Sequence, residues 1–147
     1  MNDELKEAIR MTLVSPQGGF DTTLVHQCAG LVRLDPEARL VHILHPQVPE
    51  KDRVALYCLG KHLLGYLLDD PLLGEVTRTE LVRDLALDAK KVSAYASVLI
   101  ERDKLLMRGA RGAYRTRLPG MTRHLARLRS KLKLSEVDRL AAPAPEK

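Results

Sequence analysis

VTRTELVRDLALDAKKVSAYASVLIERDKLLMRGARGAYRTRL, residues 76–118, is the stretch that decides the fold. Residues 77–85 and 88–103 each carry apolar side chains at helical spacing, and only Ala-Leu lies between the two segments. Each segment starts with a side chain that can accept a hydrogen bond from a free N–H group of the first helical turn. The candidate caps are Thr77, Thr79 and Asp88. So short a connection predicts two helices that cross steeply, as in a helix-turn-helix.

A β-hairpin is expected directly after the second helix. Residues 105–108 indicate a short strand, residues 109–112 a turn with two glycines, and residues 113–118 a return strand. Side chains alternate along the return strand, so one set should face the core and the other the solvent. The inward set is Tyr114, Thr116 and Leu118, and the outward set is Arg115 and Arg117.

Helix, tight turn, helix and hairpin, in this order, resemble the winged helix-turn-helix superfamily. The resemblance covers about residues 50–118, counting one preceding helix, and includes Val92-Ser93, Leu99 and Leu105-Leu106. Lys104 stands where a glycine is usual just before the wing. The resemblance implies a mainly α protein of the α+β class, with a winged helix-turn-helix domain at 49–119. It also implies DNA binding, although the superfamily supports several functions.

Residues 1–48 are expected to form an N-terminal helical and hairpin subdomain in front of this domain. Apolar spacing predicts helices at 3–14 and at about 22–32. Two β-rich runs flank Asp35-Pro36-Glu37, which favours a hairpin over residues 31–43. The alternative is a helix capped by Asp35, with proline at its first position.

The longest helix is expected at about residues 51–68, directly after Pro49-Glu50. Its side chains are apolar nearly all round, so it should lie at the centre of the core and be covered from two sides. Its outer face would then contact residues 1–48 or a second subunit.

A basic helix at 120–134 and a tail at 135–147 follow the hairpin. The helix has apolar residues spaced four, three and four, which matches two heptads of a coiled-coil seam. This seam would either pair two subunits into a homodimer or pack on its own domain. Its residues are Met121, Leu125, Leu128 and Leu132. The tail is rich in proline and alanine, so its end is expected to be disordered.

Positive charge is concentrated late in the chain. The net charge is +5, but residues 101–134 alone carry eleven Lys and Arg against Glu101 and Asp103, which gives +9 and leaves −4 for the rest. A basic surface of this kind is typical of a protein that binds a polyanion.

Three signals favour a cytoplasmic protein without a membrane partner. No apolar run reaches the roughly 18 residues needed to span a membrane. The first residues, Met1-Asn2-Asp3-Glu4, are acidic where a signal peptide would be basic. Two lone cysteines, Cys28 and Cys58, agree with a reducing compartment.

The candidate DNA contacts lie on the second helix and on the hairpin. A helix whose N-terminus enters the major groove brings its first residues closest to base edges and phosphates. These residues are Lys90, Lys91, Ser93, Ala94 and Tyr95 on the helix, and Arg108, Arg111, Arg115 and Arg117 on the hairpin. No Arg, Asn or Gln lies on this face of the helix, so strong base-specific readout is not expected.

No metal, cofactor or catalytic site is expected. Cys58 and His62 share a helical face, but on an apolar helix such residues are more often a packed thiol and a hydrogen-bonded imidazole. His42 and His45 lie on a strand that leads into a proline and are poorly placed for chelation. No histidine has an obvious neighbouring nucleophile, so the protein is not expected to be an enzyme.

The leading interpretation is a DNA-binding winged-helix protein, acting on double-stranded DNA as a transcription regulator or as a chromosome- or plasmid-associated factor. The alternative is a winged-helix interaction module, a scaffold or adaptor in a larger assembly, whose basic face docks an acidic protein. DNA binding predicts a steep dependence of affinity on salt, whereas the scaffold predicts weak DNA binding.

Overall fold

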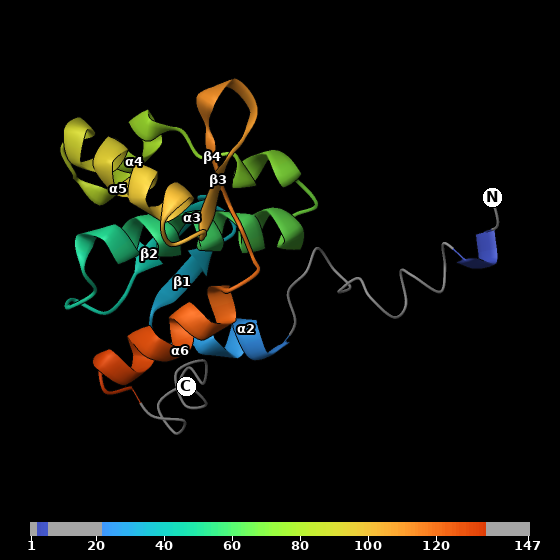
Figure 1. Cartoon of the computed structure of the whole chain (residues 1–147), viewed down its shortest axis with the longest axis horizontal. Coiled ribbons are helices and arrows are strands. Elements are labelled where there is room, and N and C mark those ends of the chain that lie inside the picture. The colour runs from blue at the N-terminus through green and yellow to red at the C-terminus, as the bar shows by residue number, and fades with distance from the viewer. Residues whose placement is uncertain (1–2, 6–21, 135–147) are drawn as a thin grey trace.

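The computed structural model describes residues 3–5 and 22–134, in which helices and two small antiparallel hairpins form a mixed α+β fold (Figure 1). This confirms the expected α+β class. The expected helix at 3–14 lies outside the described residues except for residues 3–5, which are helical, and the tail at 135–147 lies outside them entirely. The elements are α2 (Thr22–Cys28), β1 (Val32–Asp35), β2 (Leu40–Ile43), α3 (Glu50–Leu67), η2 (Pro71–Gly74), α4 (Arg78–Leu85), α5 (Ala89–Glu101), β3 (Leu106–Arg108), η3 (Ala110–Gly112), β4 (Tyr114–Thr116) and α6 (Met121–Lys131).

Helix α3 lies at the centre of the molecule, as its apolar sequence predicts. Its middle turns are buried, with Leu56 and Leu59 almost fully removed from solvent. The β1–β2 hairpin contacts it from one side, and α4, α5 and β4 contact it from others (Figure 1). The buried charged side chains of Asp52 and Lys61 each bind a polar partner, which offsets the cost of removing a charge from water.

The first hairpin pairs β1 with β2 in antiparallel register, with Val32 opposite Ile43. The hairpin prediction is therefore confirmed, and the alternative helix capped by Asp35 is wrong. Asp35 stabilises the turn instead, because its Oδ1 accepts a hydrogen bond from the N–H of Ala38 at 3.1 Å. The preceding helix ends at Cys28 and not near residue 32, since Val32 already belongs to the strand ladder.

Strand β2 approaches α3 closely because α3 has a glycine at the point of contact. A Cβ atom added at Gly60 would lie 2.6 Å from Cγ1 and 2.9 Å from Cγ2 of Val41. Carbon atoms that are not bonded do not approach so closely, so any side chain at position 60 would push the hairpin away from the helix.

Helices α4 and α5 begin at caps that the sequence predicts. Thr77 Oγ1 accepts a hydrogen bond from the N–H of Glu80 at 3.0 Å, and Asp88 Oδ1 accepts one from the N–H of Lys90 at 2.9 Å. Between the two helices, Ala86 adopts the left-handed conformation with φ of +56°, which turns the chain within the short link. Of the two threonine candidates, Thr77 is the cap.

The second hairpin pairs β3 with β4, with Leu106 opposite Thr116, and its paired segments are shorter than the sequence suggests. Tyr114 also exchanges two backbone hydrogen bonds with Val76, at 2.7 and 2.8 Å. This bridge ties the segment that precedes α4 to the hairpin. The sequence pattern around Val76 did not indicate it.

Helix α6 packs its apolar seam within its own chain. Met121, Leu125 and Leu128 are buried, and Leu132 packs against the same cluster. Helix α6 lies against α2 (Figure 1). Of the two arrangements expected for the four seam residues, packing on their own chain is the one that the structure has. A heptad pattern marks an apolar face but does not determine whether a second subunit or the same chain covers it.

Helices α2 and α6 are also joined by polar contacts. Arg129 Nη1 donates hydrogen bonds to the backbone oxygens of Gln27, at 3.1 Å, and Ala29, at 2.5 Å. One cluster of buried side chains runs from Leu24 to Leu128. The described part of residues 1–48 thus shares its core with α4 and α5.

Candidate nucleic-acid interface

The first turns of α5 present three of the five expected contact residues to solvent. Lys90, Lys91 and Ala94 are exposed. Ser93 is half-buried, and its hydroxyl accepts a hydrogen bond from Arg78 Nη1 at 3.1 Å. The expected row on α5 is therefore only partly available to a ligand.

Tyr95 points to the start of α3 and not away from the molecule. Its hydroxyl donates a hydrogen bond to Glu50 Oε1 at 2.8 Å, and Lys91 Nζ lies 3.6 Å from the same oxygen. The hydrogen bond from Tyr95, helped by the charge of Lys91, lowers the pKa of Glu50 below its usual value. Glu50 is thus ionised at neutral pH and offsets part of the charge of Lys91. Lys90 has no carboxylate at ion-pair distance among the residues described.

The four hairpin arginines are all exposed, but their surroundings differ. Arg111 lies at the tip in a left-handed conformation, with φ of +55°. The guanidinium of Arg108 lies 5.7 Å from the ring centroid of Tyr114, within the range of a cation–π contact. Arg117 Nη1 donates a hydrogen bond to the backbone oxygen of Lys104 at 3.3 Å. Arg115 Nε forms an ion pair with Glu75 Oε2 at 2.9 Å.

The alternation expected in the return strand is present. Tyr114 and Thr116 are buried while Arg115 and Arg117 are exposed. Leu118 is half-buried and packs against the core cluster. The hairpin therefore keeps an apolar side on the core and a basic side in solvent.

Glu75 holds the hairpin tip in place, and sequence reasoning missed it. Its Oε1 accepts a hydrogen bond from the N–H of Ala110 at 2.9 Å, while its Oε2 binds Arg115. Gly109 leaves room for this carboxylate, because a Cβ there would collide with Glu75 Oε1 and lie 2.8 Å from two carbons of Arg115. Ala110 is 35 residues away along the chain, so no local pattern linked it to Glu75.

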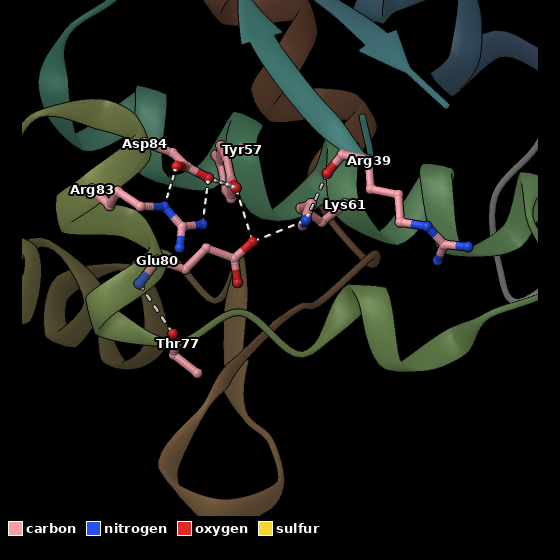
Figure 2. A network of polar contacts seen from close by, with 7 residues as sticks. All are labelled: Arg39, Tyr57, Lys61, Thr77, Glu80, Arg83 and Asp84. Carbon is pink, nitrogen blue, oxygen red and sulfur yellow. Dashed lines mark hydrogen bonds and ion pairs between the residues drawn. The ribbon is translucent and has the colours of Figure 1, made fainter. Parts of the chain in front are cut away.

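A partly buried polar network joins α4 to α3 (Figure 2). The hydroxyl of Tyr57 lies between two carboxylates of α4, 2.9 Å from Glu80 Oε2 and 2.5 Å from Asp84 Oδ2. Burial, together with these two carboxylates, strongly raises the pKa of Tyr57. The phenol therefore keeps its proton and acts as a hydrogen-bond donor to α4.

Two cations complete this network. Lys61 Nζ lies 2.9 Å from Glu80 Oε2 and donates a hydrogen bond to the backbone oxygen of Arg39 at 3.0 Å. Arg83 Nε lies 2.7 Å from Asp84 Oδ1, and this hydrogen bond is the main cause that lowers the pKa of Asp84. The network joins α4 to α3 and to the first hairpin, so it positions the link into α5.

The cysteine and histidine candidates lie apart from any cluster of ligands. Cys58 is fully buried, and burial raises its pKa. Burial likewise raises the pKa of Cys28 to about 12. Within residues 3–5 and 22–134, no three His, Cys, Asp or Glu side chains gather closely enough to hold a metal ion. In the same part of the chain, no helix is long and apolar enough to cross a membrane.

The chain was also compared with known proteins. It matches no protein-family model, no curated protein and no solved structure.

Proposed function

We propose that this protein binds duplex DNA with the first turn of α5 and the β3–β4 hairpin, in the manner of a winged helix-turn-helix. The observation that carries the proposal is a set of exposed cations without a carboxylate at ion-pair distance in the described part of the chain. They are Lys90, Arg108, Arg111 and Arg117. Helix α5 and β3 contact one another, so the helix and the hairpin that carry these cations belong to one continuous unit.

The arrangement favours contacts to phosphates over the reading of bases. Lys90 and Lys91 lie at the start of α5, where a helix entering the major groove comes closest to the DNA. Arg111, at the hairpin tip, would reach a neighbouring phosphate or the minor groove. Tyr95 is bound to Glu50, which leaves few base-reading side chains on α5. We therefore propose a cytoplasmic regulator or chromosome- or plasmid-associated factor with modest sequence preference.

The test is fluorescence anisotropy on two unrelated duplexes over a range of salt concentrations. Replacing Arg111 and Arg117 by alanine should weaken binding to both duplexes alike. The slope of log affinity against log salt should flatten by about 0.9 for each lost phosphate contact. Arg33→Ala removes an exposed arginine from the other hairpin and serves as the matched control. Lys90→Ala should, in addition, alter the preference between the two duplexes.

An interaction module is the second candidate function. The observation in its favour is a group of exposed apolar side chains where α3 ends and η2 follows. Tyr66, Leu67 and Leu72 are 51%, 58% and 75% exposed, and apolar side chains exposed close together are typical of protein contact sites. Unchanged DNA affinity and slope in the Arg111/Arg117 variant would favour this candidate. A homodimer, if one forms, would also need a surface other than the buried seam of α6.

A further inference from the structure

A hollow of about 520 Å³ lies between the start of α3, the end of α5 and one face of α6. Cationic side chains dominate its lining. They are Lys51 from α3, Arg102 from the end of α5, and Arg123, Arg127 and Lys131 from α6. Two carboxylates, Asp52 and Asp103, also line it, so five cations stand against two anions and the excess is +3.

Both carboxylates of the hollow are already bound. Asp103 lies 2.8 Å from Lys51 Nζ and 3.1 Å from Arg102 Nε. Burial by itself raises the pKa of Asp103, but these hydrogen bonds together hold it below its usual value. Asp52 Oδ1 lies 3.0 Å from His124 Nε2. Neither acid lies at ion-pair distance from Arg123, Arg127 or Lys131.

The cations of α6 form a row without a counter-charge. Arg123, Arg127 and Lys131 recur every four residues, which places them on one helical face over about 12 Å. All three are exposed, and none forms an ion pair within the described ranges. Helix α6 itself has no acidic residue. No ion pair among the described residues accounts for this concentration of positive charge.

The start of α3 adds a second source of positive potential. Pro49 precedes this 18-residue helix, and no side chain caps it by a hydrogen bond. Pro49, Lys51 and Asp52 line the hollow, so the N-terminus of α3, whose first turn also carries Glu50 and Asp52, borders it. Free N–H groups and the helix dipole favour an anion at this position.

We propose that this hollow binds a small molecule that carries two or more linked phosphate groups. The excess charge and the length of the α6 row fit an extended anion better than a single phosphate. The volume lies within the range of roughly 300–1,000 Å³ that ligand pockets occupy. Arg102 lies about 18 Å along the helix from Lys90, at the opposite end of α5. The site is thus remote from the proposed DNA contacts at the start of α5, although the N–H of Arg117 donates a hydrogen bond at 2.8 Å to the backbone oxygen of Leu105, which lines the hollow.

The test uses inorganic tripolyphosphate and isothermal titration calorimetry on the full chain, with sulfate at equal ionic strength as the reference anion. The wild type should bind tripolyphosphate more tightly than sulfate. Arg123→Ala with Arg127→Ala should weaken tripolyphosphate binding by about tenfold or more, since two charge-assisted contacts are lost. Lys90→Ala, an exposed cation at the other end of α5, is the matched control and should leave this affinity unchanged.

A second pair of measurements separates the hollow from the DNA surface. The double variant should keep duplex affinity within about threefold of the wild type. Salt screens exposed charges that lie more than about 10 Å apart, so the α6 cations should contribute little to DNA binding at the other surface. Equal affinity of wild type and double variant for tripolyphosphate would overturn the proposal. The proposal would also be overturned if the wild type did not bind tripolyphosphate and the double variant lost most of its duplex affinity. That result would assign the α6 cations to DNA binding. Arg127→Lys should retain much of the affinity and shows that charge, not folding, is measured.

Discussion

The molecule contains two antiparallel hairpins that are used in opposite ways. The β1–β2 hairpin lies flat on α3, with Val32 and Val41 buried and its turn formed around Asp35. The β3–β4 hairpin is attached to the core through Tyr114, while its other face carries exposed arginines. One hairpin therefore covers the central helix, and the other presents charge.

The difference lies in what each hairpin contacts and not in its strand geometry. Both hairpins have an arginine in the left-handed conformation near the turn, Arg39 with φ of +57° and Arg111 with φ of +55°. Arg39 Nη1 binds Asp70 Oδ2 at 2.9 Å, whereas Arg111 has no ion pair in the part of the chain that the structure describes. Similar local structure thus occurs in a hairpin whose turn arginine is paired with an acid and in one whose tip arginine is not.

The largest expected effect is on the covering hairpin. Gly60→Ala should lower the free energy of unfolding by about 2 kcal/mol, because the new Cβ overlaps Val41 and forces β2 away from α3. Urea denaturation measures this change. In a Val41→Ala background the same substitution should cost much less, since the overlapping methyl groups are gone. An equal cost in both backgrounds would show that β2 does not rest on Gly60.

A smaller loss is expected at the charged hairpin. Gly109→Ala should lower the free energy of unfolding by about 1–2 kcal/mol, because it displaces Glu75 from its two partners. Hydrogen exchange of the Ala110 N–H should become faster, and exchange in the β1–β2 ladder should not change. Glu75→Gln is the milder control, since an amide can still accept from Ala110 but loses the ion pair. Unaltered exchange at Ala110 would contradict the role assigned to Glu75.

The two arginines with left-handed backbone allow a matched comparison of DNA binding, with Arg111 as the test position and Arg39 as its control. Arg39→Gly and Arg111→Gly should each change the free energy of unfolding by only about 0.5 kcal/mol. Glycine relieves the strain of the left-handed backbone, but it loses more conformational entropy than arginine when the chain folds. Arg111→Gly should weaken duplex binding about fivefold at low salt, while Arg39→Gly should not. Anisotropy titrations on one duplex give both values. Equal losses for the two variants would mean that net charge, and not the position of the hairpin, controls binding.

The smallest expected effect is a pKa change that only the second hairpin should cause. Burial, and then the charge of Arg115, lower the pKa of His62 below its usual value. Between the folded and unfolded pKa values the unfolded chain binds more protons, so stability falls as pH drops below about 6.5. Arg115→Ala should raise the pKa of His62 and make this fall shallower. NMR titration of the imidazole measures it, and Arg33→Ala should leave it unchanged.

Much of the local structure was predictable from the sequence because its causes are local. Thr77 and Asp88 cap α4 and α5 through hydrogen bonds to residues two or three positions on. The alternation of side chains along residues 113–118 identified which side of β4 is buried. Two β-rich runs around Asp35 identified the first hairpin. The basic character of the chain after residue 100 also follows directly from composition.

The placement of apolar and charged faces was not predictable in the same way. The seam of α6 is equally suited to a second subunit or to its own core, and only the tertiary structure shows that α2 and the core cover it. Tyr95 fits a DNA-contacting position by helical spacing, yet Glu50 binds it from another helix. Periodicity gives the direction of a side chain relative to its own element but carries no information about what lies opposite.

The sequence by itself determined the elements, their caps and the sign of the surface charge, because neighbours along the chain supply those interactions. The tertiary structure alone decided which cations remain without partners. Glu75 pairs with Arg115, and Asp103 pairs with Lys51 and Arg102, while no acidic side chain among the described residues pairs with the row on α6. An ion pair depends on a separation of a few ångströms in space, and residues that meet at that distance can be far apart in the chain.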